Sequence, residues 1–86
     1  MFKKTNLINQ DEQVEVMALF GFEMTPCQPL SFRRTDGSEI EVDELLKTTI
    51  RFVGANTLHV FDVVAEGRKF KLEFNSTSLI WRLLLA

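Results

Sequence analysis

The fold class is decided by the stretch Leu30-Ser31-Phe32-Arg33-Arg34-Thr35-Asp36-Gly37-Ser38-Glu39-Ile40-Glu41-Val42. Apolar side chains recur here at every second position on both sides of Gly37, which is the period of a β-strand. The pair Asp36-Gly37 suggests a two-residue turn. That turn would place Phe32 opposite Glu41 and put the two apolar sets on opposite faces of the hairpin.

A three-residue loop over residues 35–37, with Gly37 in the left-handed conformation, solves this conflict. It sets Phe32 opposite Ile40 on one face and Arg33 opposite Glu39 on the other. Burial and charge pairing therefore agree, and we predict a β-hairpin with this register.

The second half of the chain repeats the pattern as a meander of strands. Alternating segments cover residues 48–53, 57–65 and 68–74, with turns at Gly54-Ala55-Asn56 and Glu66-Gly67 between them. If Val63 faces Phe70, Asp62 faces Lys71 as an ion pair. After a loop over residues 75–78, a last strand would place Leu79 against Phe74.

The amino-terminal third has two readings. Val14, Met17 and Phe20 lie at near-helical spacing, which would give a helix over residues 11–20 and an α+β protein. Val14, Val16, Ala18 and Phe20 also alternate as in a strand. Gly21 interrupts the helical run, so we predict a strand over residues 14–20, with residues 1–10 frayed or lightly docked.

Together these segments predict an all-β protein of five to seven antiparallel strands. The expected architecture is a small, partly open barrel of the SH3-like kind over residues 14–86, within a single domain of residues 1–86. A β-sandwich is the alternative. A chain of 86 residues has room for one core only.

Composition places the chain among ordinary globular proteins, with 45% hydrophobic and 26% charged residues. The longest run without a polar side chain covers residues 17–22, which is too short to cross a membrane, and we expect no signal peptide in the first residues. Cys27 is the one cysteine, so it has no partner for an internal disulfide. We expect a cytoplasmic protein without a membrane segment.

The charges are unevenly distributed along the chain. Residues 1–45 carry four basic and nine acidic side chains, a net charge of −5, whereas residues 46–86 carry six basic and three acidic side chains, a net charge of +3. Such a split can orient a charged partner, or simply reflect two halves of one sheet that neutralise each other.

The residues that catalysis needs are scarce. One histidine, one cysteine and no tyrosine leave no complete set of acid, base and nucleophile. His59 and Cys27 are better explained as a hydrogen-bonded histidine and a half-buried small residue, and they are too few for a zinc site. No glycine-rich phosphate loop occurs. We therefore expect no enzyme, catalytic residue, metal or cofactor.

Two surfaces are candidates for protein contact. The last strand is apolar on both faces, so either the amino-terminal residues Phe2, Leu7 and Ile8 cover Ile80 and Leu84, or these two form a patch for a homodimer or partner protein. The second surface carries the carboxylates of the acidic stretch: Glu39, Glu41 and Asp43.

These observations predict a non-catalytic protein-interaction module. The alternative is a weak nucleic-acid binder, in which four cations on the outer face would contact phosphates: Arg33, Arg51, Lys69 and Lys71. A pI of about 5.3 and the use of the aromatic residues in the core make nucleic acid the less favoured partner.

The order of strand and turn residues resembles a group of short uncharacterised bacterial all-β proteins. The shared features are a Pro-x-x-Phe strand, two glycine hairpins and a tryptophan near the end of the chain, here Pro29 to Phe32, Gly37, Gly67 and Trp81. The resemblance covers residues 14–84 and implies a small barrel and a bacterial source. It brings no catalytic residue.

Overall fold

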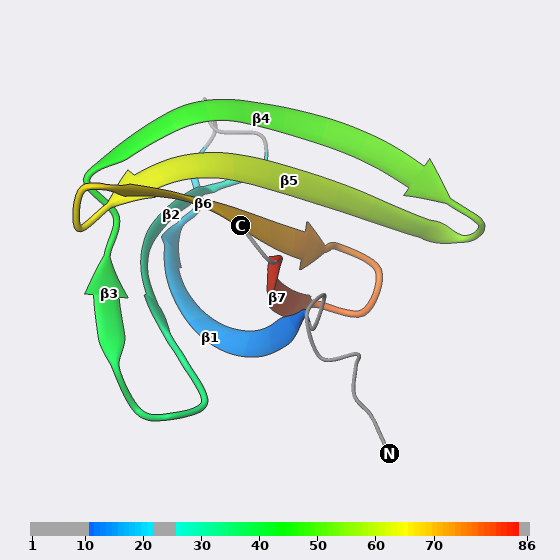
Figure 1. Ribbon diagram of the computed structural model, residues 1–86. Coiled ribbons are helices and arrows are strands. Elements are labelled where there is room, and N and C mark those ends of the chain that lie inside the picture. Colours follow the sequence, from blue (N-terminus) through cyan, green and yellow to red (C-terminus); the bar gives the residue numbers. More distant parts are fainter. Residues whose placement is uncertain (1–10, 22–25, 85–86) are drawn as a thin grey trace, which may run out of the picture.

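The protein forms one antiparallel β-sheet of seven strands in the computed structural model, which describes residues 11–21 and 26–84 (Figure 1). The strands are β1 (Glu12–Leu19), β2 (Gln28–Arg33), β3 (Glu39–Glu41), β4 (Glu44–Val53), β5 (Asn56–Ala65), β6 (Arg68–Asn75) and β7 (Ile80–Leu84). No helix occurs in these two ranges. The all-β prediction is confirmed.

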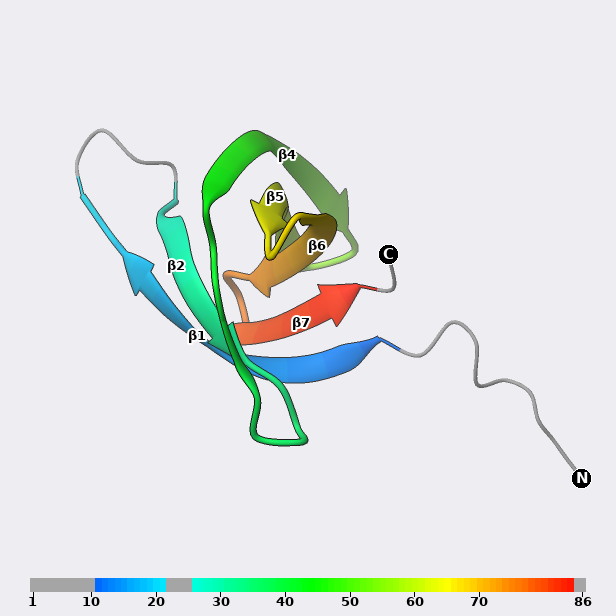
Figure 2. The same ribbon diagram turned by 60° about the vertical axis from the view of Figure 1, so that its left-hand side comes forward.

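The sheet curls into a partly open barrel, as predicted. Its strand order is β3-β2-β1-β7-β6-β5-β4, so the chain passes directly from one edge strand to the other (Figure 2). The crossing is held on both sides: the Val42 N–H donates to Leu30 O of β2 and the Asp43 N–H to Val64 O of β5, each at 2.8 Å. A single curled sheet replaces the two packed sheets of the sandwich alternative.

The hairpin of β2 and β3 has the register that the sequence predicts. Phe32 lies opposite Ile40, and Arg33 lies opposite Glu39. The loop closes through hydrogen bonds from the Arg34 N–H to Ser38 O at 2.8 Å and from the Gly37 N–H to Arg34 O at 2.9 Å. Gly37 has a φ of 92°, a conformation that residues with a Cβ rarely adopt.

The β5–β6 register is also confirmed, since Val63 pairs with Phe70 and Asp62 with Lys71. The turn between them, Glu66-Gly67, has positive φ at both positions, 53° and 73°. This is the turn geometry whose twist matches two adjoining strands.

The predicted β6–β7 register is wrong by two residues. Phe74 pairs with Trp81, and Leu79 lies in the loop with 70% of its surface exposed. Asn75 belongs to the strand rather than the loop, and its side-chain oxygen accepts the N–H groups of Thr77 at 2.9 Å and Ser78 at 3.1 Å. This local bonding moves the loop one residue along the chain. A shift of two residues keeps the same side chains on the inner face.

The amino-terminal segment, for which both a helix and a strand were considered, is the strand β1. β1 pairs with β2 on one side and β7 on the other, so the helix alternative over residues 11–20 is wrong. The backbone N–H and C=O groups of β1 find partners in the two neighbouring strands, so the alternating pattern prevails over the helical spacing. The expectation of frayed or docked residues 1–10, including the contacts of Phe2, Leu7 and Ile8, lies outside the described residues.

The core fills the inside of the curl, called the concave face below. Aromatic rings hold it together: Phe32 meets Phe70 edge to face at 5.5 Å, and Trp81 stacks on Phe74 at 4.6 Å and on Phe61 at 5.5 Å. The buried members of the core are Val14, Cys27, Phe32, Ile40, Phe61, Val63, Ala65, Phe70, Leu72, Phe74, Trp81 and Leu83.

Candidate functional site

The most distinctive surface feature is the free edge of β4. This strand ends the sheet, and among residues 11–21 and 26–84 it pairs only with β5. A bulge at Leu46 interrupts the ladder between Leu45 and Lys47, and regular pairing then continues to Val53. From Lys47 to Val53 the strand therefore presents backbone N–H and C=O groups that no strand of the described chain pairs with. We call this segment, residues 47–53, the β4 edge.

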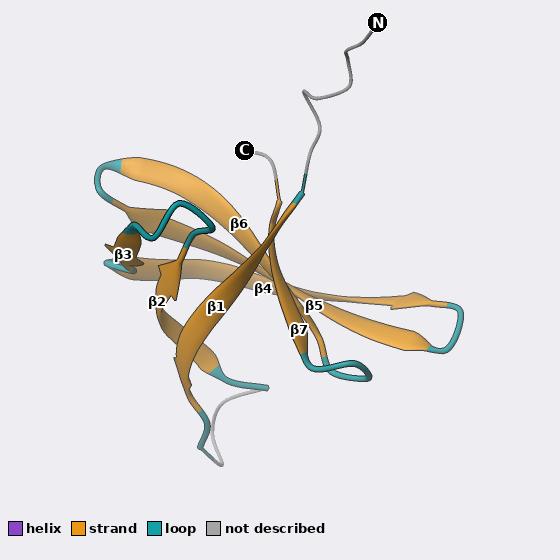
Figure 3. Ribbon diagram, turned by 90° about the horizontal axis from the view of Figure 1, so that it is seen from below, coloured by secondary structure: helices purple, strands orange, loops and turns teal. Residues whose placement is uncertain are grey.

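Two large apolar side chains of the β4 edge are exposed on the concave face. Ile50 is 45% exposed and Phe52 is 77% exposed, although their register partners His59 and Thr57 lie on the same face as the core. The β4–β5 hairpin projects past the ends of β6 and β7 (Figure 3), and beyond Asn75 the β6–β7 loop, not a strand, bonds to β5 at Thr57 and Ala55. An exposed phenylalanine at such a tip is available for contact with another molecule.

The hairpin tip is closed tightly. Val53 pairs with Asn56, and the two-residue turn between them begins with Gly54 at a φ of 61°. Glycine at the first central position is the signature of a type II′ turn, whose twist matches the adjoining strands. The projecting strand is thus one half of a regular hairpin, and its outer edge has no partner strand in the part of the chain that the structure describes. β-Strand addition uses an edge of this kind.

His59 on β5 is the register partner of Ile50 on β4. The residue is 7% exposed, Nε2 of its ring lies 3.2 Å from Ser76 Oγ, and Nδ1 has no hydrogen-bond partner among the described residues. Burial lowers the pKa of His59, because the charged ring loses its hydration. Phe74 lies beside the ring at 6.1 Å.

The acidic residues that the sequence singles out do come together. Glu39, Glu41 and Asp43 line one open hollow, and Glu66 from the β5–β6 turn joins them. Sequence reasoning missed Glu66, because nothing local in the chain places that turn beside β3. The Asp43 carboxylate accepts the Glu66 N–H at 3.2 Å, so one member of the cluster holds the turn in place.

The two apolar residues of the last strand lie elsewhere. Ile80 and Leu84 are both half-buried on the outer, convex face of β7, on either side of the exposed Arg82. Ile80 pairs with Asn75 and Leu84 with Lys71 on β6. Neither residue lines the acidic hollow. They are also less exposed than Ile50 and Phe52.

The four cations of the nucleic-acid alternative do not form one patch. Arg33 lies on β2 with the Glu15 carboxylate 3.5 Å away, and Glu39 is its neighbour on β3. Arg51 on β4 lies opposite Leu58 on β5, which in turn lies opposite Asn75 on β6. Lys69 is six residues from Asn75 along β6, so Arg51 and Lys69 are separated by about 20 Å along the strand direction.

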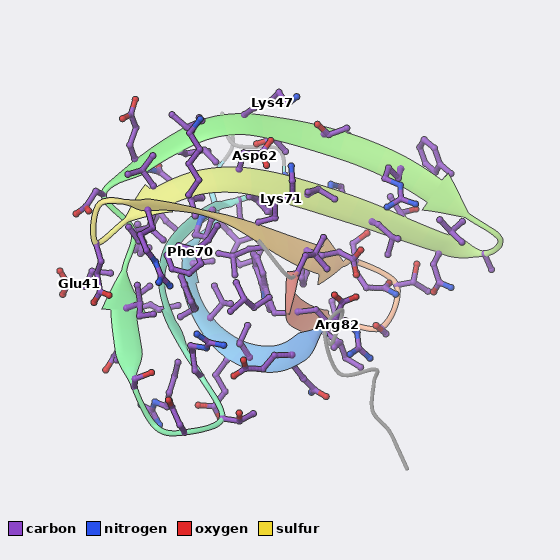
Figure 4. The ribbon with its side chains drawn as sticks, in the orientation of Figure 1. Glu41, Lys47, Asp62, Phe70, Lys71 and Arg82 are labelled. Carbon is purple, nitrogen blue, oxygen red and sulfur yellow. The ribbon has the colours of Figure 1, made fainter. Side chains whose placement is uncertain are left out.

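Lysines do gather at one place on the convex face, however. Lys69 and Lys71 line a hollow with Lys47, a residue that the sequence analysis did not single out. Figure 4 shows Lys47, Asp62 and Lys71 together on the outer side of their strands, while Phe70 points into the curl. Lys71 Nζ lies 2.6 Å from the Asp62 carboxylate, which neutralises one of the three charges.

A further polar cluster joins β1 to the β2–β3 loop. The Glu12 carboxylate lies 2.6 Å from Arg34 Nη2 and also accepts the Thr35 N–H at 2.8 Å and its hydroxyl at 3.0 Å. These donors, Arg34 first, lower the pKa of Glu12. The partners are 22 and 23 residues apart in sequence, so no local pattern reveals the cluster.

Cys27 is buried in the core at 3% exposure, and burial raises the pKa of its thiol to about 11. A thiol in this state is protonated and a poor nucleophile at neutral pH. Among the described residues, no three His, Cys, Asp or Glu side chains are placed to hold a metal ion. The same part of the chain has no helix long and apolar enough to span a membrane.

Comparison of the chain with protein-family models, curated proteins and solved structures found no match. The resemblance to short bacterial all-β proteins therefore stays a prediction.

Proposed function

We propose that this protein is a non-catalytic protein-interaction module that docks through the β4 edge. The single observation that carries the proposal is the exposure of Phe52 and Ile50 on a projecting strand whose outer backbone groups have no strand partner among the described residues. A docked strand satisfies those backbone groups, and the two side chains supply apolar contact and selectivity. The acidic hollow and the half-buried pair Ile80 and Leu84 are secondary candidates.

The proposal includes a cytoplasmic setting. Its support is the free thiol of Cys27, the one cysteine of the sequence, which is packed in the core rather than paired.

Site-specific photo-crosslinking tests the docking surface. A photoreactive phenylalanine analogue replaces Phe52 in one variant and Leu79, which is 70% exposed in the β6–β7 loop, in a matched control. Irradiation in the native cell is expected to give protein adducts from position 52 and few from position 79. Adding Ile50→Asp, which places a charge beside the contact, is expected to remove the adducts. Absence of protein adducts at position 52 would refute the proposed surface.

Weak nucleic-acid binding is the second candidate, supported by the lysines around the convex hollow, Lys47, Lys69 and Lys71. Titration with a single-stranded oligonucleotide at increasing salt tests it, because each phosphate contact steepens the fall of affinity with salt. Lys69→Glu is the informative variant, since Lys69 has no ion pair of its own among the described residues. Lack of binding at low salt, or binding that Lys69→Glu leaves unchanged, removes this candidate.

A further inference from the structure

We propose that the strand docked on the β4 edge is the β4 edge of a second copy of this chain, paired antiparallel about a twofold axis at Ile50. The inference rests on the proposed function, because it names the partner of the same surface. It follows from the strand's side-chain pattern, which allows one self-pairing register and disfavours its neighbours.

Symmetry and pleating restrict the register first. In antiparallel pairing, directly opposite side chains lie on the same face of the sheet. Between Lys47 and Val53 the faces alternate regularly, with Thr48, Ile50 and Phe52 on the concave face and the other residues on the convex face. A twofold axis between two residues would oppose side chains from different faces, so the axis has to pass through a residue.

Charge then selects among the central positions. An axis at Thr49 would place Lys47 opposite the partner's Arg51, and an axis at Arg51 would place two arginines opposite each other. Like charges directly opposite destabilise a strand pair. An axis at Ile50 avoids both, because Arg51 then faces the partner's Thr49 and Lys47 faces the partner's Val53.

Positions farther from the centre are unfavourable for another reason. An axis at Thr48 brings the bulge at Leu46 into the new ladder, where the alternation of faces breaks down. An axis at Phe52 reaches the turn at Gly54 within two residues and leaves a very short ladder. Only the axis at Ile50 uses the whole regular segment of both copies.

The selected register also covers the exposed apolar surface. Ile50 meets the partner's Ile50, and each Phe52 meets a Thr48 of the other copy, so one apolar strip runs across the junction on the concave face. Cross-strand pairs between aromatic and β-branched residues are among those that stabilise sheets. Phe52, 77% exposed in the single chain, gains the most cover.

A single-cysteine scan across the junction tests the register. Ile50→Cys, Thr49→Cys and Arg51→Cys are each placed in the full chain and oxidised mildly. Only Ile50→Cys is expected to form a disulfide-linked dimer rapidly, because only position 50 faces its own counterpart. Cys27 stays out of the reaction, since it is buried with a raised pKa. Preferred linking at position 49 or 51 would overturn the register.

Analytical ultracentrifugation tests the partner itself. The unmodified chain is expected to dimerise reversibly, and Phe52→Ala to weaken dimerisation about 100-fold, from two phenylalanines that lose cover. Leu79→Ala, at a similarly exposed site away from the β4 edge, is expected to leave dimerisation unchanged. Circular dichroism checks that each variant is folded.

The two proposals fail in different ways. A chain that stays monomeric up to about 100 µM, well above typical protein-partner dissociation constants, with no linking at position 50, overturns the second-copy inference. Photo-crosslinking of Phe52 to a different protein would in that case still support the proposed function. Adducts between two copies of this chain support both proposals.

Discussion

Phe52 and Phe61 are the same residue type in opposite surroundings, so they provide a quantitative test of whether the β4 edge lies outside the core. Phe61 is fully buried, so Phe61→Ala is expected to lower the free energy of unfolding by about 3–5 kcal/mol, from lost burial and the cavity left behind. Phe52 keeps 77% of its surface exposed, so Phe52→Ala removes only about a quarter of the free energy that full burial of the side chain would contribute. Full burial of such a side chain is worth about 1.5–3 kcal/mol, which gives about 0.3–0.7 kcal/mol for Phe52→Ala.

Urea unfolding measures both values. It is followed by circular dichroism and by the fluorescence of Trp81, the one tryptophan, which stacks on Phe61 and Phe74 in the core. The protein is kept dilute, so that self-association does not add to the stability of the unmodified chain. A domain of this size has a total stability of roughly 4–13 kcal/mol, so a loss of 3–5 kcal/mol is easily detected.

The refuting result is a large effect of Phe52→Ala in dilute solution. A loss above about 2 kcal/mol, with an unchanged urea dependence, would show that Phe52 packs within its own chain. The β4 edge would then be part of the core. A small effect in dilute solution, combined with a larger one at high concentration, is expected if the side chain contacts a second copy.

Three further predictions concern the polar and buried groups. Burial lowers the pKa of His59, so the unfolded chain binds this proton more readily than the folded chain. The His59 contribution to stability is therefore constant above about pH 6.5, the ordinary pKa of histidine, and decreases as the pH falls below it. His59→Gln is expected to flatten this part of a pH series of urea midpoints. Glu12→Gln at neutral pH is expected to cost about 1–3 kcal/mol, because Arg34 and Thr35 lose a charged acceptor, and thermal or urea unfolding measures the loss. With a pKa of about 11 and 3% exposure, Cys27 is expected to resist iodoacetamide at pH 8 until urea unfolds the chain, and mass spectrometry reads the labelling; rapid labelling of folded protein contradicts the buried placement.

Much of the fold was predictable because strand pleating leaves a direct mark on the sequence. Where a short turn joins two alternating segments, as at Gly37 and Glu66-Gly67, the turn fixes the register and the pattern checks it. The predicted β6–β7 register was wrong because no short turn fixes it. The longer loop of this connection fits more than one register, and the choice depends on side-chain bonds of Asn75 that the pattern does not encode.

The β4 edge was harder to foresee. Alternation predicts that Ile50 and Phe52 share a face, and this is confirmed, but it does not say how far the core extends beneath that face. Both faces of the last strand are apolar, which predicts an exposed contact patch at Ile80 and Leu84. In the curved sheet these two residues are half-buried. Exposure depends on strand order and on the projection of the hairpin, which arise from contacts between distant segments.

The difference between the two edges of the sheet explains why association would stop at two copies. β3 covers only three residues and carries exposed carboxylates at both ends, Glu39 and Glu41, and short charged strands resist pairing with other chains. β4 covers ten residues, and its regular part combines Ile50 and Phe52 with two separated cations. Pairing two β4 edges about a twofold axis occupies the long end strand of each copy, so that β3 is the end strand of the described sheet that stays outside the contact. Such a contact is closed, so it yields a dimer and not a filament.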